Sequence, residues 1–143
     1  MIRKFDHIGL VVRNTEETAA LLSKLFGFET AETRVEPEAG FKSTLMSQSG
    51  LTFELIEPVG PEGMIQRFVE KRGEGLHHIS IQVSDLDEEV KRLQALGVLF
   101  SSEKPMQVTE TTKVIFIHPR STNGLLIELT EKKPNTKYTK KIE

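Results

Sequence analysis

The chain has 143 residues, of which 37% are hydrophobic and 28% are charged, and its formal net charge is −2. This length suits one compact unit or two small modules with a shared core. The small net charge gives no reason to expect a nucleic-acid partner, and no apolar run is long enough to span a bilayer. With no cysteine, the chain has no disulfide and no thiolate ligand, so a bound metal must use nitrogen and oxygen ligands.

The first half of the chain starts with a strand over residues 5–12, FDHIGLVV, in which successive side chains alternate between two faces. Asn14 with Glu17 forms a capping-box pattern that begins a helix, and Gly27 suits its left-handed end. Further strands are predicted at 28–35, 41–48 and 50–57, with a tight turn at Ser49–Gly50.

The second half repeats this plan. Residues 76–83, LHHISIQV, form a strand, Asp85 with Glu88 repeats the capping pattern, and Gly97 ends the helix. Strands are then predicted at 98–102, 112–118 and 124–130, with STNG at 121–124 as a turn.

This repeat predicts an α+β fold in which two tandem βαβββ modules form a U-shaped, mostly antiparallel sheet with a metal site in the trough. We expect one domain over residues 1–131, made of modules at about 4–58 and 75–131 with a linker at 59–74. The Lys-rich tail, 132–143, is expected to be flexible. The linker contains MIQRFVEKR, which favours a short helix with a buried face of Ile65, Phe68 and Val69.

Two imidazoles and two carboxylates occupy matching places in the modules. His7 and His78 lie in the two repeated strands, and Glu54 and Glu128 lie in the strands that close each half, 47 and 50 residues later. Four such ligands can converge on one divalent ion. A buried carboxylate also needs a compensating charge, which an ion would supply.

Each of these residues has an ordinary alternative. A single strand histidine is more often a core or surface residue, and a single strand glutamate more often faces solvent; the two pairs in register favour the metal. His77 aligns with Asp6 and is expected to face away from the site. His118 and Arg120, at the end of a strand, are more typical of structural and exposed loop positions.

A site of two histidines and two glutamates leaves positions open on an octahedral ion. Such positions suit a substrate with two neighbouring oxygens, and the ion would act as a Lewis acid that stabilises an enolate after a proton leaves the adjoining carbon.

The chain resembles the vicinal oxygen chelate superfamily, and within it the methylmalonyl-CoA epimerases, over roughly residues 4 to 131. The stretches that carry this resemblance are FDHIGLVV, ELIEP, GEGLHHISIQV and FIHPRSTNGLLIELTE. The resemblance implies metal ligands at His7, Glu54, His78 and Glu128 and an ion of cobalt, manganese, nickel or zinc. It also implies an acyl-CoA substrate whose C2 loses and regains a proton, with Glu128 and Glu54 as catalytic carboxylates, and a homodimer. A cytoplasmic location is expected, because MIRKFDHIG lacks a signal-peptide pattern.

The sequence departs from this family at two places. Some epimerases place a glutamate, proposed as the base, where this chain has Ser43, with Lys42 beside it. Another group, such as Glu128, must then take the proton, or the reaction differs. Threonines and Glu110 replace glycines before the HPRS motif, and Glu110 is either a substitute acid–base group or an ordinary loop carboxylate.

Two other functions compete with the epimerase. One is a glyoxalase-I-type lactoylglutathione lyase, which uses the same metal–enolate chemistry on a thiol adduct. The other is a non-catalytic module of the superfamily that binds a small molecule. The presence of all four candidate ligands argues against the module.

Overall fold

The computed structural model describes residues 1–134, and the chain divides into two compact units. One unit is His7–His78, and the other joins Met1–Asp6 to the chain from Ile79 onward. Strands β1 (Ile2–Val11) and β5 (Gly75–Val83) therefore each contribute residues to both units. The predicted flexible tail begins at Lys132, which is the last residue of a strand, and its residues 135–143 lie outside the described part.

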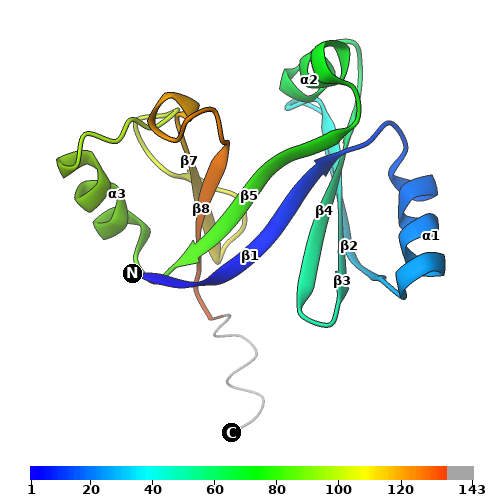
Figure 1. Ribbon diagram of the computed structural model, residues 1–143, viewed down its shortest axis with the longest axis horizontal. Coiled ribbons are helices and arrows are strands. Elements are labelled where there is room, and N and C mark those ends of the chain that lie inside the picture. Colours follow the sequence, from blue (N-terminus) through cyan, green and yellow to red (C-terminus); the bar gives the residue numbers. More distant parts are fainter. Residues whose placement is uncertain (135–143) are drawn as a thin grey trace, which may run out of the picture. The chain divides into compact units, whose positions relative to one another are not determined.

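The His7–His78 unit is a four-stranded sheet in the order β2-β3-β4-β1 with two helices (Figure 1). Its neighbouring strands are antiparallel except β1 and β4, which run parallel. The remaining elements of the unit are α1 (Thr15–Phe26), β2 (Glu29–Glu36), β3 (Phe41–Gln48), β4 (Leu51–Pro58) and α2 (Met64–Arg72).

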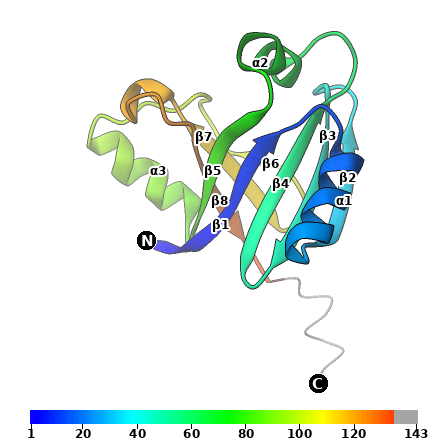
Figure 2. The same cartoon turned by 45° about the vertical axis from the view of Figure 1, so that its right-hand side comes forward.

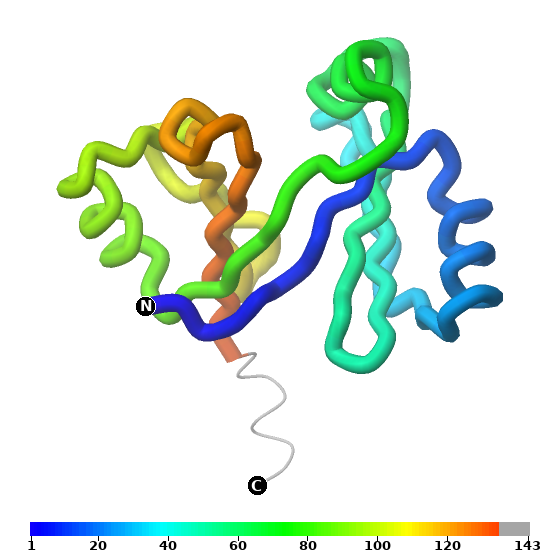
Figure 3. Tube along the Cα trace, in the orientation of Figure 1, coloured from blue at the N-terminus to red at the C-terminus, as the bar shows by residue number. Residues whose placement is uncertain are grey.

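Local signals position these elements as the sequence predicted. The Asn14 side chain accepts a hydrogen bond from the Glu17 backbone N–H at the start of α1, and Gly27 ends the helix with a φ of 75°. Ser49 and Gly50 both have positive φ, 50° and 82°. Two consecutive left-handed residues make the tight hairpin turn that matches the twist of the paired strands, here β3 and β4 (Figure 3).

The core of this unit lies on both faces of the sheet. On one face, Phe28 stacks on Phe53 at 4.9 Å between ring centroids, beside the fully buried Met46 and Leu55. On the other, α2 inserts Ile65 against Val11 and Ile56, with Phe68 and Val69 beside it. The predicted buried face of the linker helix is therefore confirmed.

The other unit has the strand order β5-β8-β7-β6, with β5 parallel to β8 and the remaining pairs antiparallel. Helix α3, labelled in Figure 2, belongs to this unit. Its Leu86 and Val90 form a core with Val83, Ile115 and Leu129. The elements not yet named are α3 (Leu86–Ala95), β6 (Met106–Gln107), β7 (Thr112–Ile117), a 3₁₀ turn (Pro119–Ser121) and β8 (Ile127–Lys132).

Two predicted strands of this second unit differ from the structure. The predicted strand at 98–102 is wrong: only Phe100 forms a bridge, to Ile117, before the chain bends away at Ser101. The strand predicted at 124–130 begins later, at Ile127. The turn before it is longer than expected, because Asn123 and Gly124 both have positive φ and the Leu125 N–H still bonds back to the Thr122 carbonyl.

The α+β fold class is confirmed, with three α-helices and eight strands in residues 1–134. Within the two units only β1–β4 and β5–β8 are parallel, so the mostly antiparallel sheet is also confirmed. Over the same residues, every helix is too short or too polar to cross a bilayer.

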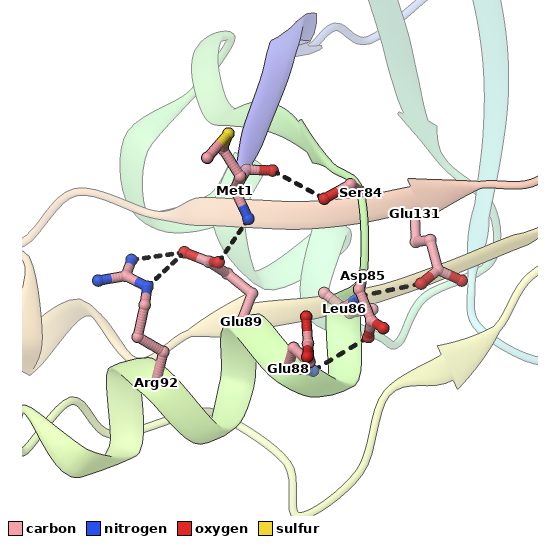
Figure 4. Close-up of polar contacts among 8 residues, drawn as sticks. All are labelled: Met1, Ser84, Asp85, Leu86, Glu88, Glu89, Arg92 and Glu131. Carbon is pink, nitrogen blue, oxygen red and sulfur yellow. Dashed lines mark hydrogen bonds and ion pairs between the residues drawn. The ribbon is translucent and has the colours of Figure 1, made fainter.

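In both units, a glutamate side chain on a strand accepts a hydrogen bond from the first N–H of a helix. In one, the Glu57 carboxylate accepts from the Thr15 N–H at 2.7 Å. In the other, Glu131 accepts from the Leu86 N–H at 2.9 Å (Figure 4). A carboxylate at this point satisfies a helix N–H that has no partner within the helix and complements the helix dipole.

A lysine on the neighbouring strand forms ion pairs with each of these glutamates and with the second residue of the helix. Lys42 Nζ lies 3.8 Å from Glu57 and 3.8 Å from Glu16, the second residue of α1. Lys113 Nζ lies 3.8 Å from Glu131 and 3.0 Å from Asp87, the second residue of α3. The duplication therefore includes the attachment of each helix to its sheet.

The N-terminal residue is tied to α3. The Met1 amine lies 3.0 Å from Glu89, which also binds Arg92, and the Met1 carbonyl accepts from the Ser84 hydroxyl (Figure 4). The Ser84 backbone N–H donates to the same carbonyl. The hydrogen bond from Arg92 lowers the pKa of the Glu89 carboxyl despite its burial, and the Met1 amine adds to this effect.

We expect Glu131→Ala to lower the free energy of unfolding by about 1–3 kcal/mol, because it leaves the buried Leu86 N–H without an acceptor. Glu131→Gln should cost clearly less, since the amide oxygen can still accept. Urea denaturation measures both, with Glu88→Gln in the exposed first turn of α3 as the matched control. Equal losses for Glu131→Ala and Glu88→Gln would contradict this role.

Candidate metal centre

Three potential ligand atoms meet in the His7–His78 unit. His7 Nε2 on β1 lies 3.0 Å from His78 Nε2 on β5. Oε1 of Glu54, on β4, lies 3.4 Å from His78 Nε2 and 3.6 Å from His7 Nε2. Both histidines are buried, at 8% and 4% exposure. The parallel register pairs Glu54 with Gly9, so the carboxylate lies across from the strand position two residues after His7.

These separations fit a shared divalent ion. Nitrogen and oxygen ligands lie about 2.1 Å from zinc and similar ions. At that length, two ligands are about 3.0 Å apart at a right angle and about 3.4 Å apart at the tetrahedral angle. The three observed separations, 3.0, 3.4 and 3.6 Å, lie close to this range. The residues therefore fit a metal ion bound through two imidazoles and one carboxylate.

The charge states also suit a cation. The pKa of His78 is lowered to about 4, chiefly by burial. The nearby Glu54 carboxylate opposes this lowering, and the His7 and His77 imidazoles add to it. Burial acts to raise the pKa of Glu54, but the hydrogen bond and charge of His7, with contributions from His78 and Ser43, hold it below its usual value. At neutral pH the site therefore presents a neutral His78 and an ionised Glu54, which are the forms that bind metal.

Ser43 orients the Glu54 carboxylate. Its hydroxyl donates to Glu54 Oε2 at 2.9 Å, and the residue is only 2% exposed. Oε1 is then the oxygen that lies near both histidines. Ser43 thus orients a candidate metal ligand, as outer partners of metal ligands commonly do. Sequence reasoning had identified the position but not this contact.

Gly9 makes room for the His78 imidazole. A Cβ atom at Gly9 would overlap the ring, with His78 Nε2 only 2.8 Å away. Gly9 is therefore required by close approach, and its own φ is not in the left-handed region. The matching residue of the second half is Ser80, whose hydroxyl donates to Glu128 Oε1 at 2.8 Å. The two halves differ at this position because one leaves space and the other supplies a hydrogen bond.

The fourth predicted ligand, Glu128, lies in the other unit. It is 8% exposed and is paired in register with Ser80 on β5. Its carboxylate is held by that serine, as Glu54 is held by Ser43. The group of ligand atoms within 4.8 Å of one another comprises His7, Glu54 and His78. Glu128 as a fourth ligand stays a prediction.

The other residues that the sequence singled out have various roles. His118 Nδ1 accepts from the Arg120 N–H at 3.1 Å, so His118 caps the 3₁₀ turn, as expected of a structural histidine. Arg120 is exposed within this 3₁₀ turn, and Glu110 is exposed on a loop. His77 packs its ring against Phe68 of α2, but its Nδ1 is also 2.9 Å from Nδ1 of His78. The sequence did not predict that contact, because strand alternation separates neighbouring side chains.

Comparison with known proteins identifies the family and agrees with the fold. The family model of the glyoxalase/bleomycin resistance protein/dioxygenase superfamily matches residues 6–116. The chain belongs to this superfamily. The resemblance to the vicinal oxygen chelate proteins seen in the sequence is thereby confirmed.

Several similar members of the superfamily are named methylmalonyl-CoA epimerases. The mitochondrial methylmalonyl-CoA epimerase of Dictyostelium discoideum is 32% identical over 132 residues, which is 92% of this chain and 80% of that protein. The crystal structure of the methylmalonyl-CoA epimerase of Mycobacterium tuberculosis has a TM-score of 0.88 at 27% identity, over 96% of this chain and 93% of that one. A variant of the Streptomyces coelicolor enzyme, in complex with 2-nitronate-propionyl-CoA, has a TM-score of 0.85 at 25% identity, over 94% and 100%.

We expect Gly9→Ala to destabilise this superfamily member by about 1–3 kcal/mol, the usual cost of overpacking a buried site. The added methyl group must displace the His78 imidazole, so divalent-metal affinity should fall as well. Thermal unfolding and isothermal titration calorimetry measure these effects.

A double-mutant cycle provides the control for Gly9→Ala. In a His78→Ala background the ring is gone, and the added methyl group should cost little. If Gly9→Ala is equally destabilising with and without the imidazole, the close approach is not the reason for the glycine.

Proposed function

We propose that the chain is a metal-dependent methylmalonyl-CoA epimerase that uses His7, Glu54, His78 and Glu128 as metal ligands. The observation that carries this proposal is the meeting of three ligand atoms at 3.0 to 3.6 Å in a buried part of the sheet. The relatives support it as well, because the Dictyostelium protein and the two solved structures named above are methylmalonyl-CoA epimerases. This favours epimerisation over the lactoylglutathione lyase reaction and over a non-catalytic module.

The residues divide into ligands and orienting groups. A divalent ion bound to the two imidazoles and the carboxylates would supply Lewis-acid stabilisation of the enolate that develops when C2 of the substrate loses its proton. His7 and His78 offer Nε2, and Glu54 offers Oε1. Ser43 and Ser80 hold the carboxylates of Glu54 and Glu128 in single orientations through short hydrogen bonds.

Epimerisation at C2 requires a proton to leave one face of the carbon and another to arrive at the opposite face. We assign these transfers to Glu54 on β4 and Glu128 on β8, whose carboxylates are buried or nearly buried. Ser43 is not the base in this proposal; its hydroxyl donates to Glu54 Oε2 and orients that carboxylate.

Several finer properties belong to the same proposal. The ion is cobalt, manganese, nickel or zinc, and elemental analysis of the isolated protein tests this. The protein is a cytoplasmic homodimer, which cell fractionation and light scattering test. Exposed apolar side chains on α1, among them Leu21 and Leu25 at 52% and 57% exposure, offer a surface for a second copy.

The direct test is hydrogen exchange at C2. Incubation of the metal-loaded protein with (2S)-methylmalonyl-CoA in deuterated water should place deuterium at C2 and produce the (2R) epimer, as followed by NMR and mass spectrometry. Exchange that is absent with each of the four metals would overturn the proposal. Turnover of the hemithioacetal of methylglyoxal and glutathione, with no exchange at C2, would favour the lyase.

Two variants separate binding from proton transfer. His78→Ala should lower metal affinity by at least about tenfold and abolish exchange, because it removes a ligand. Glu128→Gln should lower the rate of C2 exchange by about 100-fold or more, the usual contribution of a positioned acid or base. An unchanged metal affinity in His78→Ala, with unchanged binding of the acyl-CoA, would instead favour a non-catalytic binding module.

A further inference from the structure

His77 and His78 are neighbours on β5 and their rings contact each other. The two Nδ1 atoms are 2.9 Å apart, and the ring planes are inclined by 84°. Ring nitrogens at this separation share one hydrogen, so one Nδ1 donates and the other accepts. The direction of this hydrogen bond decides where each imidazole carries its hydrogen.

The direction of this hydrogen bond follows from the other nitrogen of His78. His78 Nε2 is 3.0 Å from His7 Nε2 and 3.4 Å from Glu54 Oε1, so Nε2 is the atom that faces the candidate ion. A nitrogen that binds a metal offers its lone pair, and a neutral imidazole then carries its hydrogen on the other nitrogen. His78 Nδ1–H is thus the donor and His77 Nδ1 is the acceptor.

His77 is itself held by the linker helix. Its ring meets the Phe68 ring of α2 at 5.1 Å between centroids and 73° between planes. The Arg72 guanidinium lies 5.8 Å from the centroid of the same Phe68 ring. Helix α2 is fixed to the sheet by Ile65, which is 5% exposed in the cluster with Val11 and Ile56. The acceptor therefore has a defined position.

We propose that His77 is a positioning residue of the metal centre, whose Nδ1 accepts the Nδ1 hydrogen of His78 and keeps Nε2 of His78 available as a ligand. A carboxylate, a backbone carbonyl or a water usually fills this place behind a metal-binding histidine. Here a neighbouring imidazole does so. The inference rests on the metal site of the proposed function, but not on the identity of the acyl substrate.

The variants His77→Leu and His77→Asn test this role. Leucine keeps much of the apolar contact with Phe68 but cannot accept a hydrogen bond, whereas the Asn side-chain oxygen can replace Nδ1 as the acceptor. We expect His77→Leu to weaken divalent-metal binding by about 10- to 100-fold, the usual loss for an outer partner of a ligand. His77→Asn should stay within about threefold of the unchanged protein by the same reasoning. Titration calorimetry with Co²⁺ or Zn²⁺ and no substrate measures this.

A second measurement reads the hydrogen bond without a metal. Long-range ¹H–¹⁵N NMR of the metal-free protein reports which nitrogen of His78 carries the hydrogen. We expect it on Nδ1 in the unchanged protein and in His77→Asn, and a shift of population toward Nε2 in His77→Leu. A merely structural role of His77 would change thermal stability but not this equilibrium.

The outcomes distinguish this inference from the proposed function. A His78 hydrogen found on Nε2 in the unchanged, metal-free protein overturns the inference, even if His77→Leu does not fold. Equal metal affinity for His77→Leu and the unchanged protein overturns it as well, and leaves the metal site standing. If the unchanged protein binds none of the four metals, the proposed function fails instead, and with it the positioning role that rests on it.

Discussion

A carboxylate and two imidazoles that converge in a buried place constrain the rest of the His7–His78 unit. Glu54 has a side-chain exposure of 15%, and its Oε1 lies within 3.6 Å of two ring nitrogens. An ionised carboxylate in such a place is costly unless opposite charge compensates it, and a cation would do so. Ser43, Gly9 and His77 all support this arrangement, through a hydrogen bond, an open space and a second hydrogen bond.

The duplicated architecture explains how a small chain builds such a centre. Each half fastens its helix to its sheet with a glutamate three residues beyond the candidate ligand, Glu57 after Glu54 and Glu131 after Glu128. In each pair the first glutamate is a candidate for chemistry and the second holds a helix N-terminus. The strand that carries a candidate ligand is therefore also a strand that anchors a helix.

Much of this could be predicted from the sequence because its signals are local or repeated. The caps at Asn14 and Asp85 and the turn at Ser49–Gly50 depend on residues a few positions apart. The pairing of His7 with His78 could be predicted by comparing the two halves, but the distance between their Nε2 atoms could not. Both halves share a Glu-Leu-x-Glu pattern, whose second glutamate is Glu57 or Glu131. This repeat is a sequence signal for the two glutamates that bind helix N-termini.

The rest depended on contacts that no local pattern encodes. Gly9 has an ordinary backbone conformation, and its need to be glycine arises from a ring 69 residues away in the chain. The segment at 98–102 has apolar residues typical of a strand, but it finds partners only around Phe100 and then bends away. His77 was expected to face away from the site, but its Nδ1 lies 2.9 Å from Nδ1 of His78, while its ring contacts Phe68.

The most direct measurement is anomalous X-ray diffraction from crystals grown with Co²⁺, with data collected on both sides of the cobalt absorption edge. The account predicts one strong anomalous peak within about 2.3 Å of His7 Nε2, His78 Nε2 and Glu54 Oε1. A peak bound elsewhere, or only by one of these three residues, would contradict the claim that they hold a single ion.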